Sequence, residues 1–427
     1  MTKLSWNKLP LKDLFRLDTM SCLPASQPEQ AFLHHSIPAW DESGGPVVEL
    51  GNTIGSNKFL ISHPCILVSK LNPRKSRVSV VRDLSGEFPQ CASTEFMVYV
   101  PIHEDADIGF YGLYMTSEYF QSELKRVATG TTNSHVRVTP KETLNWKIAQ
   151  PPLPEQRRIA EILDTIDEAI QKTEALISKL KAMKQGLLHD LLTRGLDKNG
   201  KLRDPKAHPE QFKDLPLGRI PREWKVEKLG EICRRTGGSV QTGPFGSQLH
   251  AKDYKDRGIP IITVEHLGDN QIIYNNLPLV GRMDYERLER YRIETGDLVF
   301  SRVGAIDRCA YVSEQENGWL FSGRCLRVRT GGNFVNPRFL SFQLNSYGSR
   351  KWILNHSVGS TMACLNTSIL SEVPVSLPPI QEQRAIALLL DAHDACIRTE
   401  EGYRDKLKLQ KKGLMHDLLT GKVRVKV

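Results

Sequence analysis

The sequence predicts an α/β (α+β) chain that contains two β-rich modules with pseudo-two-fold symmetry, each followed by a long helix. The first observation is a repeat: residues 151–193 return without a gap at 378–420, about half of the 427-residue chain later. The second is that residues 1–150 and about 215–375 are rich in short β-type runs broken by Gly, Pro, Asn and Asp. A repeat this long exceeds the roughly 20–50 residues of a solenoid period, so it indicates a duplicated module-plus-helix unit.

The two modules share their frames and differ in their centres. Trp6 and Trp224 open the modules, and each is followed by apolar residues at the same spacing. Residues 128–139 resemble residues 358–368, and both segments lie just before a long predicted helix. Between these ends the modules diverge almost completely. We therefore expect the frames to serve a common assembly and the centres to recognise different targets.

Each repeated segment is predicted to be one long helix. The apolar residues after each proline pair fall mostly at three-and-four spacing, which is typical of a packing stripe. The first stripe consists of Ile159, Ile162, Leu163, Ile166, Ile170, Leu176, Leu180, Met183, Leu187 and Leu191, and the second of Ile386, Leu390, Ile397, Leu407, Leu414 and Leu418, with interruptions at His393, Glu400 and Lys411. From Glu155 to Thr193 such a helix extends roughly 58 Å. Two imperfect stripes predict helices that pack on each other. A plain dimerisation coiled coil is the alternative, but it leaves the duplication unexplained.

The polar segment 194–221, rich in Gly and Pro, is predicted to be a connector. Residues 195–201 match the first seven positions of a phosphate-loop pattern, but Leu202 stands where Ser or Thr must hold magnesium. Residues 223–225 form an E-x-K string without a paired upstream acid, so a two-carboxylate nuclease site is not indicated. We expect no catalytic site in this chain.

Composition favours a polyanionic partner. The net charge is +9 and the isoelectric point is about 9.0. Five basic residues crowd between positions 70 and 82: Lys70, Arg74, Lys75, Arg77 and Arg82. The eight cysteines are scattered without a C-x-x-C pair, so neither a zinc site nor a disulfide framework is indicated. The N-terminus has no apolar stretch, and no window approaches the roughly 18 apolar residues of a membrane span, so we expect a cytoplasmic protein.

Three groups of motifs resemble the DNA-specificity subunit (S subunit) of type I restriction-modification systems. The second module contains QTGPFGSQLHAKDYKDRGIPIITVEHL at 241–267 and YRIETGDLVFSRVGAIDRCAYV at 291–312. The helix opening PP-x-x-EQ-x-x-I-A-x-x-L-D occurs twice. Residues 35–42 and 65–78 of the first module resemble a different subtype of the same domain, which lacks the GPFGS string. The resemblance covers essentially the full chain.

The resemblance implies a non-catalytic DNA-binding subunit. Two target-recognition domains each read one half of a bipartite, asymmetric double-stranded DNA sequence, and two antiparallel helices form a coiled coil between them. It implies target-recognition domain 1 at 1–150, a helical spacer at 151–197, the connector with target-recognition domain 2 at 198–375, and a second helical spacer at 376–427. The helices dock two methyltransferase subunits, and translocase-nuclease subunits can join.

The expected chemistry belongs to those partners. The chain has neither a G-x-G loop after a strand nor an N/D-P-P-Y/F string for methylating a flipped base. We therefore expect no cofactor or metal in this chain, and S-adenosylmethionine, ATP and Mg²⁺ on the partner subunits.

The side chains expected to contact DNA are mostly basic or amide side chains, because Arg suits guanine, Gln and Asn suit adenine, and phosphate contacts add affinity. The candidates are Lys58, Lys70, Asn72, Arg74, Lys75 and Arg77 in the first module, and Gln241, Thr242, Gly243, Phe245, Gly246, Ser247, Gln248 and Arg302 in the second. The alternatives are solubilising surface charge for the first set, and a structural turn for the glycines and Phe245. Two other classes stay open: a structural coiled-coil DNA-binding protein outside restriction, and a nucleic-acid enzyme with an unrecognised site.

Overall fold

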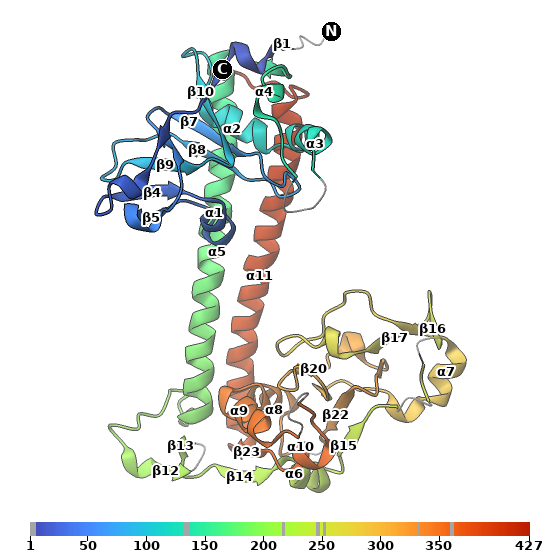
Figure 1. Ribbon diagram of the computed structural model, residues 1–427. Coiled ribbons are helices and arrows are strands. Elements are labelled where there is room, and N and C mark those ends of the chain that lie inside the picture. Colours follow the sequence, from blue (N-terminus) through green and yellow to red (C-terminus); the bar gives the residue numbers. More distant parts are fainter. Residues whose placement is uncertain are drawn as a thin grey trace. The chain divides into compact units, whose positions relative to one another are not determined.

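The computed structural model describes residues 6–130, 136–215, 218–244, 248–250, 253–331, 333–358 and 363–427. The chain divides into two compact units: unit 1 contains Met1–Ala175 and Glu401–Val427, and unit 2 contains Leu176–Glu400. Both long helices of Figure 1, α5 (Leu153–Thr193) and α11 (Ile380–Leu419), contribute residues to both units. Each helix begins directly after its proline pair, as the repeat predicted.

Unit 1 contains a four-stranded sheet in the order β2-β10-β7-β8, a five-stranded sheet in the order β3-β6-β9-β4-β5, and the two-stranded pair β1-β11. The strands are β1 (Asn7–Pro10), β2 (Phe15–Asp18), β3 (Ser21–Cys22), β4 (Ala31–His35), β5 (Val47–Leu50), β6 (Lys58–Ile61), β7 (Cys65–Ser69), β8 (Val78–Val81), β9 (Gln90–Ser93), β10 (Phe96–Pro101) and β11 (Lys147–Gln150). All five residues of β7 are buried, which explains its continuous apolar run CILV.

The helices of unit 1 besides α5 and α11 are α1 (Ile37–Ser43), α2 (Ile108–Thr116), α3 (Glu118–Val127) and α4 (Pro140–Thr143). Asp107 caps the start of helix α2, and its carboxylate accepts a hydrogen bond from the Phe110 N–H at 2.8 Å. A Cβ on Gly112 would lie 2.2 Å from Val80 Cγ2, so glycine lets α2 pack closely on β8. This packing buries Phe110 and Tyr111 against the four-stranded sheet.

Unit 2 contains sheets in the orders β15-β22-β19-β20 and β16-β18-β17-β21, and the pairs β12-β13 and β14-β23. The strands are β12 (Phe212–Leu215), β13 (Gly218–Pro221), β14 (Lys225–Lys228), β15 (Ser239–Thr242), β16 (Tyr254–Lys255), β17 (Ile259–Ile262), β18 (Leu279–Val280), β19 (Leu298–Ser301), β20 (Cys309–Tyr311), β21 (Leu320–Phe321), β22 (Cys325–Arg329) and β23 (Pro374–Leu377). The shorter helices are α6 (Leu229–Thr236), α7 (Arg282–Arg287), α8 (Pro337–Leu344), α9 (Tyr347–His356) and α10 (Thr367–Ser371).

The same frame is built twice. The sheet β15-β22-β19-β20 repeats the strand order of β2-β10-β7-β8, and the pair β14-β23 repeats β1-β11. Helices α8 and α9 repeat α2 and α3, with side-chain N-caps at Asn336 and Ser346 in place of Asp107 and Ser117. The predicted α+β fold with duplicated modules is therefore confirmed.

The paired Glu-Gln of each helix opening ties the helix to its module. Gln156 Nε2 donates to the Pro151 carbonyl at 2.9 Å, and Gln156 Oε1 accepts from the N–H of Asp107 at 2.9 Å. In unit 2, Gln383 makes the same two bonds, to the Pro378 carbonyl and from the N–H of Asn336. Both glutamines are buried. The PP-x-x-EQ string thus orients each long helix relative to the helix that covers its sheet.

The long helices run antiparallel in each unit. In unit 2, Leu191 near the end of α5 shares a core with Ile386 near the start of α11. In unit 1, Leu163 near the start of α5 shares a core with Leu418 near the end of α11. The antiparallel pairing is confirmed within each unit. Among the helices of the described segments, none is long and apolar enough to cross a membrane.

Most of the predicted packing stripe faces inward. Ile159, Leu163, Leu191, Ile386, Leu390, Leu407 and Leu418 are buried, and Ile166, Leu180, Leu187 and Leu414 are half-buried. The prediction was wrong for Leu176 and Met183, which are 42% and 51% exposed. Thr173 and Ile177 are buried instead. The residues at the seam between the helices follow each other at strictly alternating intervals of three and four, whereas the prediction considered only which residues are apolar.

All eight cysteines are free. Five of them are buried, and Cys396 is exposed. In the parts of the chain that the structure describes, no three His, Cys, Asp or Glu side chains are grouped closely enough to hold a metal ion.

Candidate nucleic-acid interface

Three arginines meet at one end of the main sheet of unit 2. Arg302 directly follows β19, and its N–H donates to the Arg324 carbonyl at 2.8 Å. The N–H of Ser301 donates to the Arg308 carbonyl at 3.1 Å. Arg308 and Arg324 directly precede the flanking strands β20 and β22 and are exposed, while Arg302 is half-buried. We call Arg302, Arg308 and Arg324 the arginine edge of unit 2.

The turn that begins TGPFGS lies against the same edge. Gly243 donates its N–H to the carbonyl of Cys325 at 3.1 Å, next to Arg324. A Cβ on Gly243 would lie 2.1 Å from the Ser322 carbonyl oxygen, so no larger residue fits there. Thr242 is the last residue of β15 and pairs with Leu326. Phe245, Gly246 and Ser247 lie outside the described residues.

The two candidate glutamines are held by other side chains. Gln241 Oε1 accepts a hydrogen bond from Arg327 Nη2 at 2.5 Å, and Gln241 Nε2 donates to the Arg290 carbonyl at 3.4 Å. Burial, together with the nearby Arg329 charge, lowers the pKa of the Arg327 guanidinium. Gln248 Oε1 accepts from the Tyr291 hydroxyl at 2.8 Å. Each carboxamide therefore has a fixed orientation, which limits the hydrogen-bond pattern it can present to a ligand.

Unit 1 has the same edge at the end of β7. The N–H of Ser69 donates to the Arg77 carbonyl at 2.9 Å, and the N–H of Lys70 donates to the Glu95 carbonyl at 2.9 Å. These bonds repeat those of Ser301 and Arg302 one for one. Lys70 and Arg302 thus occupy equivalent positions.

The turns that follow these cations also match. Ser69 Oγ donates to the Leu71 carbonyl at 3.1 Å, as Ser301 Oγ donates to the Val303 carbonyl at 2.8 Å. The next residue has a left-handed backbone in both units, with φ of 44° at Asn72 and 75° at Gly304. Asn and Gly are the residues that adopt this conformation most readily. The candidate Asn72 therefore shapes the turn that presents Lys70.

The neighbours of the shared cation differ between the units. Arg77 is buried and forms two hydrogen bonds with the Asp41 carboxylate, at 2.8 and 2.9 Å. Lys75 pairs with the same carboxylate at 2.7 Å. The hydrogen bonds from Arg77, opposed by desolvation and joined by the one from Lys75, hold the pKa of Asp41 well below its usual range. Arg137 pairs with Glu95 beside them, so acids offset much of the charge at this edge.

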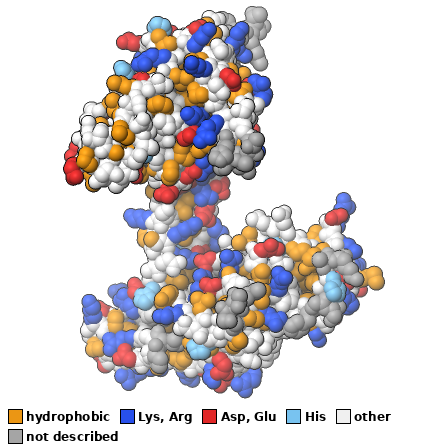
Figure 2. All heavy atoms as spheres, in the orientation of Figure 1, with side chains coloured by type: hydrophobic (Ala, Val, Ile, Leu, Met, Phe, Trp, Pro, Cys, Tyr) orange, Lys and Arg blue, Asp and Glu red, His pale blue; other side chains and the backbone are white. Residues whose placement is uncertain are grey.

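The remaining candidates of the first module are divided between core and surface. Lys58 is buried, and its ammonium donates to the Ser56 carbonyl at 3.0 Å. Arg74 is exposed in the turn before β8. On the face shown in Figure 2, Lys and Arg side chains are interspersed with acidic and hydrophobic ones and do not form one continuous patch.

Sequence reasoning missed Arg308 and Arg324, and it missed the equivalence of Lys70 with Arg302. The strings LVSKLN at 67–72 and VFSRVG at 299–304 carried the signal, since each ends a buried strand with Ser, a cation, an apolar residue and Asn or Gly.

Comparison with known proteins gives one consistent family. A family model described as "Type I restriction modification DNA specificity domain" matches residues 5–182 and 221–409. The chain is 25% identical over 321 residues to the type I restriction enzyme MjaVIII specificity subunit of Methanocaldococcus jannaschii, covering 74% of this chain and 70% of that protein. It is 28% identical over 241 residues to the EcoBI specificity subunit of Escherichia coli, covering 55% and 49%.

A solved structure has the same fold. The crystal structure of a type I restriction-modification system S subunit from M. genitalium superposes with a TM-score of 0.59 at 14% identity, covering 98% of this chain and 97% of that one. The duplicated sheets and the paired long helices are thus shared with that protein. The two segments matched by the family model cover more than half of the chain and show that it belongs to the family of type I restriction-modification DNA specificity domains.

Proposed function

We propose that this chain is the DNA-specificity subunit of a type I restriction-modification complex, and that each unit reads one half of a bipartite, asymmetric DNA target. The observation that carries the proposal is the matched pair of edges, where Lys70 and Arg302 extend from identical turns at the end of sheets with the same strand order. The equivalent sheets and turns place one side chain that contacts the bases at the same point of each unit. Different neighbours then present different donor and acceptor patterns to the bases.

The two edges differ in charge, which supports reading of two different sequences. The arginine edge of unit 2 has three guanidiniums, of which that of Arg302 also donates to the Gly323 carbonyl at 3.4 Å. A guanidinium can form a bidentate pair with guanine or a phosphate. At the edge of unit 1, Arg77 and Arg137 are already paired with Asp41 and Glu95. Lys70 is thus the basic candidate of this edge without such an acid partner among the described contacts. We expect unit 2 to supply the larger share of the salt-dependent affinity.

The chemical steps belong to partners in this proposal. Two methyltransferase subunits dock on the helix pair and bind S-adenosylmethionine, and translocase-nuclease subunits with ATP and Mg²⁺ complete a complex that cleaves. The chain itself holds no cofactor and turns over no substrate. It acts in the cytoplasm, where DNA is accessible to the complex.

Co-expression with a methyltransferase subunit of a type I restriction-modification system tests the proposal. Mapping of methylated adenines should reveal one bipartite sequence that disappears when this chain is omitted. A structural DNA-binding protein outside restriction would bind DNA and leave the methylome unchanged. A nucleic-acid enzyme would turn over DNA or ATP as the isolated chain in Mg²⁺. Either result would contradict the proposal.

A further inference from the structure

Two lysines lie in the seam between the long helices. Counting by alternating three and four residues, the seam of α5 consists of Leu163, Ile166, Ile170, Thr173, Ile177, Leu180, Lys184, Leu187 and Leu191. The same count along α11 places Lys411 at the position equivalent to Lys184 in the repeat. A lysine at a seam position reduces the apolar contact between helices, so it needs a partner.

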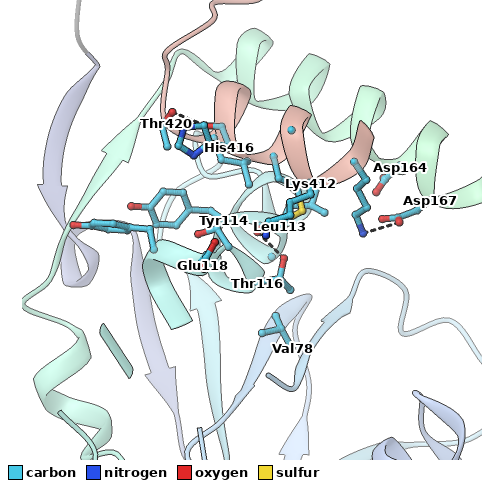
Figure 3. Close-up of a pocket in the computed structure, with 18 of the residues that line it drawn as sticks. Val78, Leu113, Tyr114, Thr116, Glu118, Asp164, Asp167, Lys412, His416 and Thr420 are labelled. Atoms are coloured by element: carbon cyan, nitrogen blue, oxygen red, sulfur yellow. Dashed lines mark hydrogen bonds and ion pairs between the residues drawn. The ribbon is translucent and has the colours of Figure 1, made fainter. Parts of the chain in front are cut away.

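Each lysine has an aspartate of the opposing helix as its partner. In unit 2, Lys184 Nζ of α5 lies 2.5 Å from Asp394 Oδ1 of α11, and the two side chains are only 12% and 14% exposed. In unit 1, Lys411 Nζ of α11 lies 2.6 Å from Asp167 Oδ1 of α5. In Figure 3 a dashed line at Asp167 marks this ion pair, and Asp164 lies on the same helix. The repeat relates the two pairs with the roles of the helices exchanged.

A second aspartate one turn earlier joins each helix to its module. Asp391 of α11 accepts from Arg338 Nε of α8 at 2.6 Å, and Asp164 of α5 accepts from Arg82 Nη2 at 3.0 Å. The two arginines come from different elements. A Cβ on Gly109 would lie 2.6 Å from Arg82 Nη2, so the glycine makes room for the guanidinium. In each D-x-x-D string the first aspartate binds an arginine of the module and the second binds the lysine of the opposing helix, and in unit 2 the second, Asp394, also lies 3.6 Å from Arg338 Nη2.

We propose that the pairs Lys184–Asp394 and Lys411–Asp167 determine the register in which α5 and α11 pack, and thereby the number of base pairs between the two half-sites. The second part rests on the function proposed above. Knobs and holes recur every seven residues, so the apolar positions of the seam alone do not distinguish registers that differ by one heptad. A slide separates each half-buried lysine from its aspartate and leaves the ammonium without that partner in a poorly solvated seam. Of the two aspartates, Asp394 keeps a second cation, Arg338 Nη2, at 3.6 Å. One heptad corresponds to about 10.5 Å, or about three base pairs at 3.4 Å each.

The decisive variant replaces both pairs by apolar residues in the full chain: Lys184→Met, Asp394→Leu, Lys411→Met and Asp167→Leu. Apolar replacement of ion pairs usually preserves folding and often stabilises it, so the helices should still pack. We expect the melting temperature to stay level or rise. We also expect methylated sites with the native spacer to be joined by sites whose spacer differs by about three base pairs.

The matched control removes an ion pair of the same helix outside the seam. Lys172 and Glu168 pair within α5 at 3.2 Å, and both side chains are largely exposed. Replacing Lys172→Met and Glu168→Leu should leave one spacer.

Charge-reversal variants distinguish an effect on the helix register from a general loss of stability. Lys411→Asp alone places two aspartates together and should abolish assembly or broaden the spacer distribution. Adding Asp167→Lys restores an attractive pair in the native register. The double variant should return to a single native spacer, which a loss of stability alone would not produce.

A direct measurement of register does not depend on methylation. Spin labels on the exposed Cys396 and on Met183→Cys lie on opposite helices of unit 2, with the half-buried Cys22 and Cys364 replaced by serine. Pulsed electron paramagnetic resonance should give one distance with native pairs and at least two in the apolar variant.

The outcomes separate the two proposals. One distance and one unchanged spacer in the four-residue apolar variant would overturn the register inference. A native complex that methylates no bipartite sequence would refute the proposed function, and the spin-label distances would still decide the register.

Discussion

Arg424 forms a bidentate pair with Glu155: its Nε and Nη2 donate to the two carboxylate oxygens at 2.7 Å each. Trp6 Nε1 donates to the same carboxylate at 3.1 Å. Glu155 stands in the first turn of α5 and its side chain is 3% exposed. The C-terminal segment, the start of the module and the start of the helix are thus joined at one carboxylate in unit 1.

Unit 2 contains the same arrangement, in which an arginine and a tryptophan donate to one glutamate at the start of a long helix. Here the arginine comes from the connector and not from the C-terminal segment. Arg203 Nη1 donates to Glu382 at 2.6 Å, and Trp224 Nε1 donates to it at 3.3 Å. The arginines end the related strings GKLR at 200–203 and GKVR at 421–424. The connector of one unit and the C-terminal segment of the other therefore perform the same structural task.

Removing Arg424 should destabilise unit 1 in a pH-dependent way. Burial raises the pKa of Glu155, but hydrogen bonds from Arg424, Trp6 and the Val425 N–H outweigh it, so the net pKa is lowered. A lowered pKa contributes stability above the unfolded value, near 4.5, that is lost as the pH falls through the folded value. Arg424→Ala should cost about 1–3 kcal/mol at pH 7, measured by denaturant unfolding.

The pH series distinguishes this pair from a general packing defect. The difference in unfolding free energy between native chain and Arg424→Ala should shrink as the pH falls from about 5 to 3. Arg424→Lys keeps the positive charge but cannot form the bidentate pair, so its unfolding free energy should lie between those of the native chain and Arg424→Ala. A difference that stays constant with pH would show that the charge of Glu155 plays no part.

The arginine edge predicts separable effects on one half-site. Arg302→Ala should reduce discrimination at one base pair by about 1–3 kcal/mol if the guanidinium reads a base. If it contacts a phosphate, affinity should fall equally for all sequences and the salt dependence should weaken by about one charge. Competition binding on variant half-sites separates the two cases.

Lys70→Ala, at the equivalent position, should affect only the other half-site. If both variants affected the same half-site, the assignment of one edge to each half-site would be wrong.

Much of the architecture could be predicted from the sequence, because a gapless repeat and a proline-initiated apolar stripe are local signals. The side-chain roles could not. Arg77 looked like a DNA contact within a basic run, but Asp41, distant in sequence, buries and neutralises it. A prediction based on apolar residues could not place Lys184 in the seam, since the aspartate that pairs with it lies on the other helix. Lys70 and Arg302 share a backbone hydrogen-bond pattern, and few residues around them are alike.

Exchange of a whole module should change one half-site only. Replacing residues 1–150 by the corresponding module of a relative retains Glu155 and Gln156, which hold the module through Trp6 and the start of α2. The new module must therefore carry a tryptophan at the position of Trp6. Methylome mapping should show one new half-site, one unchanged half-site and the native spacer. If both half-sites changed together, the two units would not read DNA independently.

Lengthening both helices by one heptad should widen the target without altering its halves. The insertion points after Leu176 and after Glu400 lie at the boundaries of the compact units, so neither module nor ion pair is disturbed inside its unit. Seven residues keep the seam in phase and add about 10.5 Å, so the spacer should grow by about three base pairs. The same insertion in α5 alone leaves α11 unmatched, and Lys184–Asp394 and Lys411–Asp167 can no longer form together. That variant should lose methylation or give mixed spacers. An active double insertion with the native spacer would show that the helix pair does not set the distance between half-sites.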